Sequence, residues 1–256
     1  MKKIRILGTN LAALAGTIVT ASSSATDWPI ANLKTIWPKY VHRTLNLGTP
    51  DFWEWDFGVA PSINYIILWN HNFQSTATVK LQADVHSGHW ADVDLPLQYG
   101  VHWNDHVLVY FFRRPIANCL YWRVTADDSA PANPAGYLQA GYAYLGGFLQ
   151  PAYSFKEKGG GVIDPSTILL SDGGQPSTNE KDAYETYDYD FSAATPADLV
   201  TLITYFKSLK KGWPFFIIED DSYPLNVRFV RFRTDFNYRP FVAGYKSYRL
   251  EVEDAR

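Results

Sequence analysis

The stretch YDFSAATPADLVTLITYFKSLKKGWPFFIIED, residues 189–220, reads as a strand, a helix and a second strand. A hydroxyl cap at Thr195, a proline directly after it and the acid Asp198 together predict the start of a helix. Apolar residues then recur at spacings of three and four, and Gly212 follows the last lysine, so we predict a helix over 196–211. The aromatic and β-branched run after it is typical of a buried strand. The apolar helix positions are Leu199, Leu202, Ile203, Phe206 and Leu209.

The rest of the chain reads as β-structure, because no other segment has a comparable helix signal. Short apolar or alternating runs follow one another over residues 52–145 with turn residues between them, which is typical of a β-sandwich. Two glycines and Pro151 then mark a boundary. We therefore predict a mainly β protein of two domains, a β-sandwich over 1–147 and a small β-sandwich with the helix over 148–256.

The composition limits the classes of function. The net charge of the 256 residues is −3 and only 19% of them are charged, which argues against a nucleic-acid binder and against a disordered chain. Aromatic residues make up 16% of the sequence, and such side chains favour strands and protein interfaces. No run approaches the ~18 apolar residues that a membrane helix needs, so we predict no membrane insertion.

The N-terminal segment has some features of a secretory signal peptide. Met1-Lys2-Lys3 precedes a partly apolar stretch that ends in small residues. The stretch contains Arg5, Gly8 and Asn10, however, and is too polar for the apolar region of such a signal. We therefore predict a strand over Ile4–Leu7 and no signal.

No catalytic motif is present in the sequence. A Ser-His-Asp triad has no support, since there is no Gly-x-Ser-x-Gly turn and no histidine after residue 106. The acids between residues 51 and 56, or those at 219–221, could supply the two carboxylates of a glycoside hydrolase, but adjacent acids at strand ends are more often solvated turn residues. The glycines at 159–161 lack the lysine and helix of a phosphate-binding loop and are interpreted as a linker. We therefore predict no enzymatic activity, no catalytic residue and no cofactor.

Histidines and tryptophans gather between residues 86 and 106. The four histidines there invite a metal site, but their spacing is irregular and no cysteine lies among them, so we predict solvated loop histidines and no metal. Two tryptophans fall in expected loops beside them, and an aromatic face with hydrogen-bonding neighbours suits a sugar ring. The alternative is that these rings pack beneath the loops or against another protein. The candidate ligand-binding residues are His86, His89, Trp90 and Trp103.

Two segments of opposite charge lie in the second domain. Glu180–Asp190 carries five acids against one lysine, and Arg228–Arg239 carries four arginines against one aspartate. One interpretation is that both are solvated strand faces of one fold, paired with each other. The other is that each meets its opposite on the next subunit of a ring. The candidate subunit-interface residues are Glu185, Asp188, Arg228, Arg231 and Arg233.

The order of several motifs in the first domain is informative. Ala21-Ser-Ser-Ser24 is followed by a tryptophan and then by Trp53-Glu-Trp-Asp-Phe-Gly58, with Tyr121–Val124 and Gly141–Gly146 later in the chain. This series resembles the discoidin-type galactose-binding jelly rolls. The resemblance implies a β-sandwich of jelly-roll type. The terminal cysteine pair of that family is missing, so an extracellular animal context is not implied, and no ligand residue is carried over.

A second set of motifs lies in the second domain. Tyr187-x-Tyr189-x-Phe191, the helix start at Ala197, the Pro214-Phe-Phe216 strand and Tyr245-x-x-Tyr248-x-Leu250 resemble the distal-tail and tail-tip ring proteins of long-tailed bacteriophages. The resemblance implies a β-sandwich with one helix, related to the tail-tube fold, that assembles into rings.

Together the two resemblances imply a structural component of a bacteriophage tail tip or baseplate, a minor tail protein located in the virion tail and in the host cytoplasm during assembly. Its expected partners are tube and hub proteins of the tail, further copies of itself in a ring, and a host surface glycan if the jelly roll keeps a ligand; nucleic acid is not expected. The alternative function is that of a carbohydrate-binding module that recognises a host surface glycan. A third is that of an accessory domain of a secreted bacterial hydrolase.

Overall fold

The computed structural model describes residues 3–37, 39–48, 50–92, 98–103, 106–170, 175–220, 222–223, 226–242 and 244–255, with the backbone alone for 98–103, 113–114 and 170. Contacts between residues divide the chain into two compact units. The first unit comprises Leu7–Phe148, and the second comprises mainly Leu149–Asp221 and Val227–Ala255 together with the residues before Leu7. Each unit has its own hydrophobic core.

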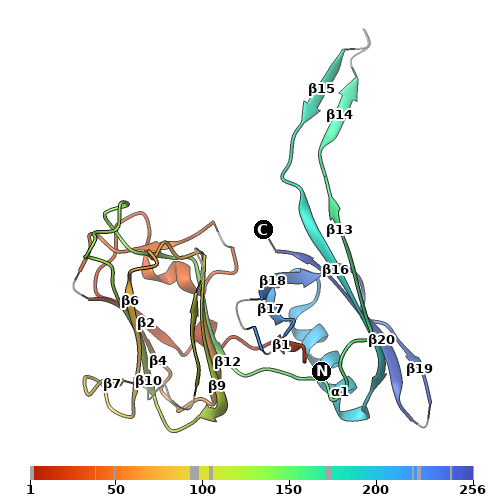
Figure 1. Ribbon diagram of the computed structural model, residues 1–256, viewed down its shortest axis with the longest axis horizontal. Coiled ribbons are helices and arrows are strands. Elements are labelled where there is room, and N and C mark those ends of the chain that lie inside the picture. The colour runs from red at the N-terminus through yellow and green to blue at the C-terminus, as the bar shows by residue number, and fades with distance from the viewer. Residues whose placement is uncertain are drawn as a thin grey trace. The chain divides into compact units, whose positions relative to one another are not determined.

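The first unit is a sandwich of two antiparallel sheets, which face each other in Figure 1. One sheet has the strand order β2-β4-β10-β6-β7 and the other the order β12-β5-β9-β8. The described residues of the unit also form a short pair, β3 with β11, and the 3₁₀ helices η1 and η2. The bounds are β2 Ile18–Ala21, β3 His42–Arg43, β4 Asp51–Asp56, β5 Ile63–Trp69, β6 Thr78–Asp84, β7 Ala91–Asp92, β8 Gln98–Trp103, β9 Val107–Ile116, β10 Tyr121–Asp127, β11 Gln139–Ala140, β12 Tyr142–Gly146, η1 Leu11–Ala13 and η2 Ile30–Lys34.

The chain of the first unit passes from one sheet to the other between β4 and β5, between β5 and β6, and again between β9, β10 and β12. Such wrapping of one chain around two sheets is the jelly-roll arrangement. Side chains alternate along β4, so that Trp53 and Trp55 are fully buried while Phe52 and Glu54 face outward. The two tryptophans join Trp122 of β10 in the core between the sheets. The sandwich predicted for this part of the chain is confirmed.

The second unit is a seven-stranded sheet with one helix. The strand order is β1-β17-β18-β20-β16-β13, with β19 also paired to β20. β20 pairs with β18 through its C-terminal end and with β19 through its N-terminal end, so all these strands belong to one hydrogen-bonded sheet. The bounds are β1 Arg5–Leu7, β13 Glu157–Ile163, β16 Tyr184–Ala194, α1 Pro196–Leu209, β17 Phe215–Ile218, β18 Val227–Phe232, β19 Tyr238–Pro240 and β20 Lys246–Asp254.

The predicted helix is present as α1. The hydroxyl of Thr195 accepts a hydrogen bond from the backbone N–H of Asp198 at 3.1 Å, which is the expected N-terminal cap. Leu202 is buried against the sheet, and Phe206 packs on Phe232 with ring centres 5.1 Å apart. The helix ends at Leu209, earlier than predicted, because Lys210 adopts a positive φ of 53° that cannot continue a helix. No described helix is long and apolar enough to cross a membrane.

The N-terminal strand corrects the predicted domain boundary. The strand expected at Ile4–Leu7 exists as β1, but it pairs with β17 in the sheet of the second unit. Ile6 and Leu149 exchange two backbone hydrogen bonds of 2.9 and 2.8 Å, and the side chains of Ile4 and Ile6 are buried in the core of the second unit. The first unit therefore starts at Leu7 and not at residue 1.

A long hairpin leaves the sheet of the second unit at its β13 edge. β13 pairs with β16, and the chain continues into β14 (Thr167–Leu170) and β15 (Pro176–Asn179), which pair with each other. Figure 1 shows β14 and β15 projecting from the sheet, and we call residues 164–170 and 175–183 the extension. Ile168 and Leu169 in it are exposed. No other described strand pairs with β14 or β15.

The three glycines interpreted as a linker are instead part of β13. A Cβ atom on Gly160 would lie only 2.5 Å from the backbone oxygen of Thr186 on β16. Only glycine can occupy that place without displacing the neighbouring backbone. Gly160 therefore serves the close pairing of β13 with β16, and the glycine run is part of a strand and not a flexible connection.

Candidate functional site

The turn between β6 and β7 holds three of the four candidate ligand-binding residues. Asp84 ends β6, and its carboxylate accepts a hydrogen bond of 2.8 Å from the backbone N–H of His86. The imidazole rings of His86 and His89 meet edge to face with their centres 6.4 Å apart, and both side chains are exposed. Trp90 follows and is half-buried. The structure thus brings His86, His89 and Trp90 together in one exposed turn.

An arginine on the neighbouring strand fixes the position of the tryptophan ring. The guanidinium carbon of Arg123 in β10 lies 4.2 Å from the centre of the Trp90 ring and 5.2 Å from that of Phe52. The Arg123 Nε and Nη2 groups both donate to the side-chain oxygen of Gln82, at 2.9 and 2.7 Å. Two aromatic contacts and two hydrogen bonds therefore hold this cation against the outer face of the five-stranded sheet.

A carboxylate completes the cluster around Arg123. Glu54 of β4 is the direct cross-strand neighbour of Arg123, and Gln82 is its neighbour on the other side. Partial burial raises the pKa of Glu54, and the charge of Arg123 opposes that rise. Burial lowers the pKa of Arg123, and the charge of Glu54 opposes that fall. Both charges are partly withdrawn from water. At such a partly buried position a hydrogen bond to a ligand is stronger than at a fully exposed one.

The fourth candidate ligand-binding residue lies elsewhere. Trp103 was expected in a loop, but its backbone belongs to β8 in the four-stranded sheet, whereas Trp90 adjoins the five-stranded sheet. The Trp103 side chain lies outside the part of the chain that the structure describes. The structure therefore does not join Trp103 to the cluster of His86, His89 and Trp90.

Arg123 and Gln82 were not among the site residues predicted from the sequence. A signal for Arg123 was present in Tyr121-Trp-Arg-Val124, because strand alternation places Trp122 in the core and therefore turns Arg123 outward. Which aromatic rings would cover the cation depends on the pairing of β10 with β4 and β6, which short-range patterns do not supply.

Of the acids considered for hydrolysis, Asp51 does not share a face of β4 with Glu54 and Asp56, and Asp221 lies outside the described residues. Asp51 is buried and accepts hydrogen bonds from the Ser22 hydroxyl at 2.6 Å and from the Gly48 N–H at 2.7 Å. Glu54 and Asp56 face the opposite side of β4. Among the described residues, no group of three or more His, Cys, Asp or Glu side chains is arranged to hold a metal ion.

The candidate interface residues form ion pairs inside the second unit. Arg233 lies 2.9 Å from the carboxylate of Asp188 and 3.3 Å from that of Glu251. Arg231 lies 2.8 Å from the carboxylate of Glu253. The acidic and basic segments therefore meet within one chain, as one of the two interpretations expected.

A buried carboxylate organises the pairs around Arg228. Glu219, at the end of β17, lies 2.7 Å from Arg228, 2.8 Å from Lys158 and 2.6 Å from the hydroxyl of Tyr189. Burial alone would raise the pKa of Glu219, but these hydrogen bonds and the Arg228 charge outweigh it, so the pKa lies below its usual value. Arg228 also reaches Glu185 at 3.4 Å. The network joins β13, β16, β17 and β18, which is a structural role. The predicted contact of these charges with a neighbouring subunit stays untested.

Comparisons with known proteins found similar solved structures only. No protein-family profile matches the sequence, and no curated protein is similar enough to count as a relative. A family 32 carbohydrate-binding module of NanJ from Clostridium perfringens, solved with galactose, is 15% identical with a TM-score of 0.42; the alignment covers 55% of this chain and 98% of the module. Chitosan-binding module 1 of a chitosanase/glucanase from Paenibacillus sp. IK-5 is 17% identical with a TM-score of 0.42, over 54% of this chain and 99% of the module. Likeness at this level does not by itself indicate what this chain binds.

Proposed function

We propose that the first unit binds carbohydrate at the turn that carries His86, His89 and Trp90, and that the protein catalyses no reaction. The observation that carries the proposal is the half-buried ring of Trp90 at an otherwise exposed turn. Arg123 packs on this ring and is itself hydrogen-bonded to Gln82. A binding surface that is already ordered loses less conformational entropy when a ligand arrives.

The chemistry of the cluster suits a sugar. A sugar ring has an apolar C–H face, which packs on an aromatic ring, and a rim of hydroxyl groups, which need donors and acceptors. Trp90 offers the aromatic surface, and the imidazoles of His86 and His89 together with the carboxylate of Glu54 offer hydrogen-bonding groups on the same unit. Arg123 contributes by orienting Trp90 and by its remaining N–H groups.

A glycan array followed by calorimetry with the best ligand tests this function. The change Trp90→Ala should weaken binding roughly tenfold or more, the equivalent of about 1.4 kcal/mol, because it removes the stacking surface. Trp37→Ala is the matched control, since Trp37 is an exposed tryptophan of the same unit outside the cluster. Both variants should remain folded, as circular dichroism and thermal unfolding would show. The proposal fails if the wild type binds no glycan, or if both tryptophan variants bind as the wild type does.

A second candidate function is that of a subunit in a larger protein assembly. The extension favours it, because a two-stranded hairpin alone is marginally stable in water and this one exposes Ile168 and Leu169. Contact with another protein would cover these side chains. The sequence resemblance to distal-tail proteins gives this candidate its specific form, a subunit of a phage tail tip or baseplate in contact with further copies of itself and with tube and hub proteins. A concentration series of the purified protein tests for self-association.

A further inference from the structure

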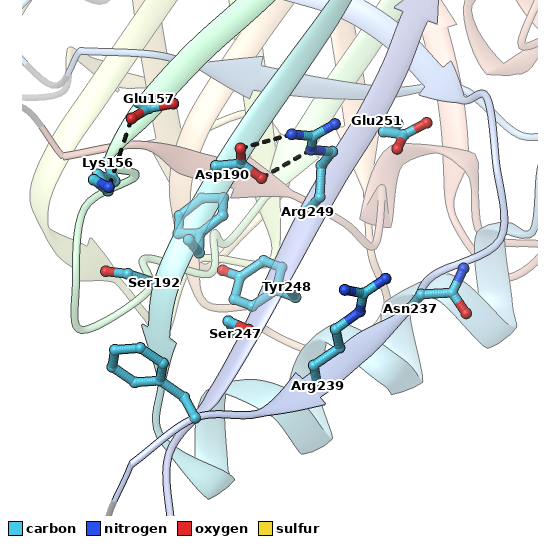
Figure 2. Close-up of a pocket in the computed structure, with 12 residues that line it drawn as sticks. Lys156, Glu157, Asp190, Ser192, Asn237, Arg239, Ser247, Tyr248, Arg249 and Glu251 are labelled. Carbon is cyan, nitrogen blue, oxygen red and sulfur yellow. Dashed lines mark hydrogen bonds and ion pairs between the residues drawn. The ribbon is translucent and has the colours of Figure 1, made fainter.

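The second unit contains a cavity of about 640 Å³ on its sheet, separate from the cluster around Trp90. Small-molecule sites typically have volumes of roughly 300–1,000 Å³, so a ligand of the size of one or two sugar rings would fit. Figure 2 shows side chains from β16, β19 and β20 around it, with residues at the start of β13 on one side. The lining residues that bear on the inference are Asp190, Ser192, Asn237, Arg239, Phe241 and Ser247.

Most of the charges that line the cavity are paired, either with one another or with a neighbouring residue. Arg249 donates two hydrogen bonds of 2.8 Å to the two carboxylate oxygens of Asp190, and this contact lowers the pKa of Asp190. Lys156 lies 3.6 Å from the carboxylate of Glu157. The remaining acid, Glu251, lies 3.3 Å from Arg233, which is not among the lining residues.

One cation is left over among the lining residues. Arg239 makes no hydrogen bond or ion pair with any other side chain that lines the cavity (Figure 2). Arg239 is the direct cross-strand neighbour of Ser247, so it rises on the same face of the sheet. Among the described residues that line the cavity, Arg239 is therefore the cation that remains available to a ligand carboxylate, at the β19 side.

The other open groups suit a hydroxylated ring. Ser192 lies in an irregularity of β16 between Phe191 and Ala194, where a bulge changes the direction of side chains. With Ser247 it presents hydroxyl groups to the cavity. The amide nitrogen of Asn237 donates to the backbone oxygen of Asp235 at 3.1 Å, which leaves the amide oxygen as an acceptor.

An aromatic ring stands at the edge of the cavity. Phe241 is 56% exposed, although its backbone is fixed by a turn in which its N–H donates to the oxygen of Tyr245 at 3.0 Å. An exposed aromatic ring beside hydroxyl groups matches the C–H face and the polar rim of a sugar.

We propose that this cavity binds a carboxylate-bearing sugar of the hexuronic acid type. Arg239 holds the carboxylate, the hydroxyl groups of Ser192 and Ser247 and the amide of Asn237 bind the sugar hydroxyls, and Phe241 packs on the ring. Asp190 and Arg249 neutralise each other, so the pair adds little net charge to the cavity. The inference does not rest on binding at Trp90, because its residues belong to the other unit.

The test compares glucuronate with glucose in NMR titrations of the full chain, because the two sugars differ only at C6, where glucuronate has a carboxylate and glucose a hydroxymethyl group. Glucuronate should bind at least roughly tenfold more tightly than glucose, and added salt should reduce the difference. The change Arg239→Gln should weaken glucuronate binding to the level of glucose. Phe241→Ala should weaken the binding of both sugars. Lys207→Gln, which removes an exposed cation of α1 outside the cavity, is the charge-matched control and should bind as the wild type does.

Three outcomes would overturn the proposal. Equal binding of glucuronate and glucose would remove the role of the carboxylate. Unchanged glucuronate binding by Arg239→Gln would place the ligand elsewhere. Acetate that binds as tightly as glucuronate would show an anion contact without recognition of a sugar. The variant Trp90→Ala should leave glucuronate binding unchanged, so failure at either site is distinguishable from failure at the other.

Discussion

His42 is buried in the first unit with its imidazole held in one protonation state. The indole N–H of Trp53 donates to His42 Nδ1 at 2.8 Å, so Nδ1 is the acceptor and the ring proton sits on Nε2. Nε2 lies 3.1 Å from the backbone oxygen of Ser23, to which it donates. Burial lowers the pKa of His42 to about 4, against the opposing effects of the Ser23 hydrogen bond and the charge of Asp51. Protonation of Nδ1 would make it a hydrogen-bond donor, so that it and the indole N–H of Trp53 would point at each other.

The stability of the first unit should therefore fall in mild acid. The folded-state pKa of His42 lies below the ordinary value near 6.5, so the unfolded chain binds the proton more tightly. The contribution of the neutral His42 ring to the free energy of unfolding is fully present above pH 6.5 and is lost as the pH falls toward 4. At pH 4.5 this loss amounts to about 2.5 kcal/mol. Urea unfolding at pH 7.5 and 4.5 measures it. In His42→Gln the amide oxygen can accept from Trp53 without titrating, so this variant should lose less stability. Equal losses of stability in the wild type and in His42→Gln would contradict the assignment of this pH effect to His42.

For single residues, the sequence indicates which side chains have functional groups suited to binding, but not which partners these side chains contact. Trp90 could be singled out because an aromatic ring with histidines nearby is a local pattern. Its contact with Arg123 depends on strand pairing between residues far apart in the chain. The same holds for Arg233, whose charge was evident but whose partners Asp188 and Glu251 come from two other strands.

Among the elements, β13 shows how one glycine controls a strand pair. Gly160 faces Tyr187 in the register of β13 and β16, and its Cα approaches the Thr186 backbone so closely that no side chain fits. At Gly161 a Cβ atom would meet its nearest neighbour, the Thr186 hydroxyl oxygen, at an ordinary distance of 3.8 Å. The two positions therefore differ in steric demand although they are adjacent and both exposed.

This difference predicts opposite outcomes for two similar changes. Gly160→Ala should destabilise the second unit by about 1–3 kcal/mol, because the added methyl group forces β13 away from β16. Gly161→Ala should be neutral or slightly stabilising, since glycine weakens a strand interior. Urea unfolding gives the free energies, and hydrogen exchange of the β13 amides shows whether the loss is local. Similar effects of both changes would mean that the close approach at Gly160 does not exist in solution.

The elements differ in how far local signals determine them. The helix could be predicted because its cap, its apolar spacing and its ending lie within one short stretch, 195–212. The sequence predicted a linker at the glycines of β13, because consecutive glycines are compatible both with a linker and with a strand at a sheet edge. β1 was recognised as a strand but placed in the wrong unit, since its partner β17 lies at the other end of the chain.

For the whole molecule, the internal ion pairs change how a self-association test must be designed. Reversing Arg231 and Arg233 would remove their contacts with Glu253, Asp188 and Glu251, so it would destabilise the second unit itself. A loss of assembly in that variant would say nothing about a contact between subunits. A clean test needs residues that face solvent and have no structural role in either core, and the extension supplies them.

If the protein is a subunit of an assembly, the extension should be one of its contacts. Ile168 and Leu169 are 69% and 64% exposed, so changing both to serine should leave the unfolding temperature unaltered while it reduces self-association. Val200→Ser is the matched control, because Val200 is 65% exposed on α1. Sedimentation velocity over a range of protein and salt concentrations measures the outcome. Association through the apolar extension should persist at high salt, whereas association through charges should weaken there. A wild-type chain that stays monomeric throughout, or a double variant that associates normally, would contradict a role of the extension in self-association.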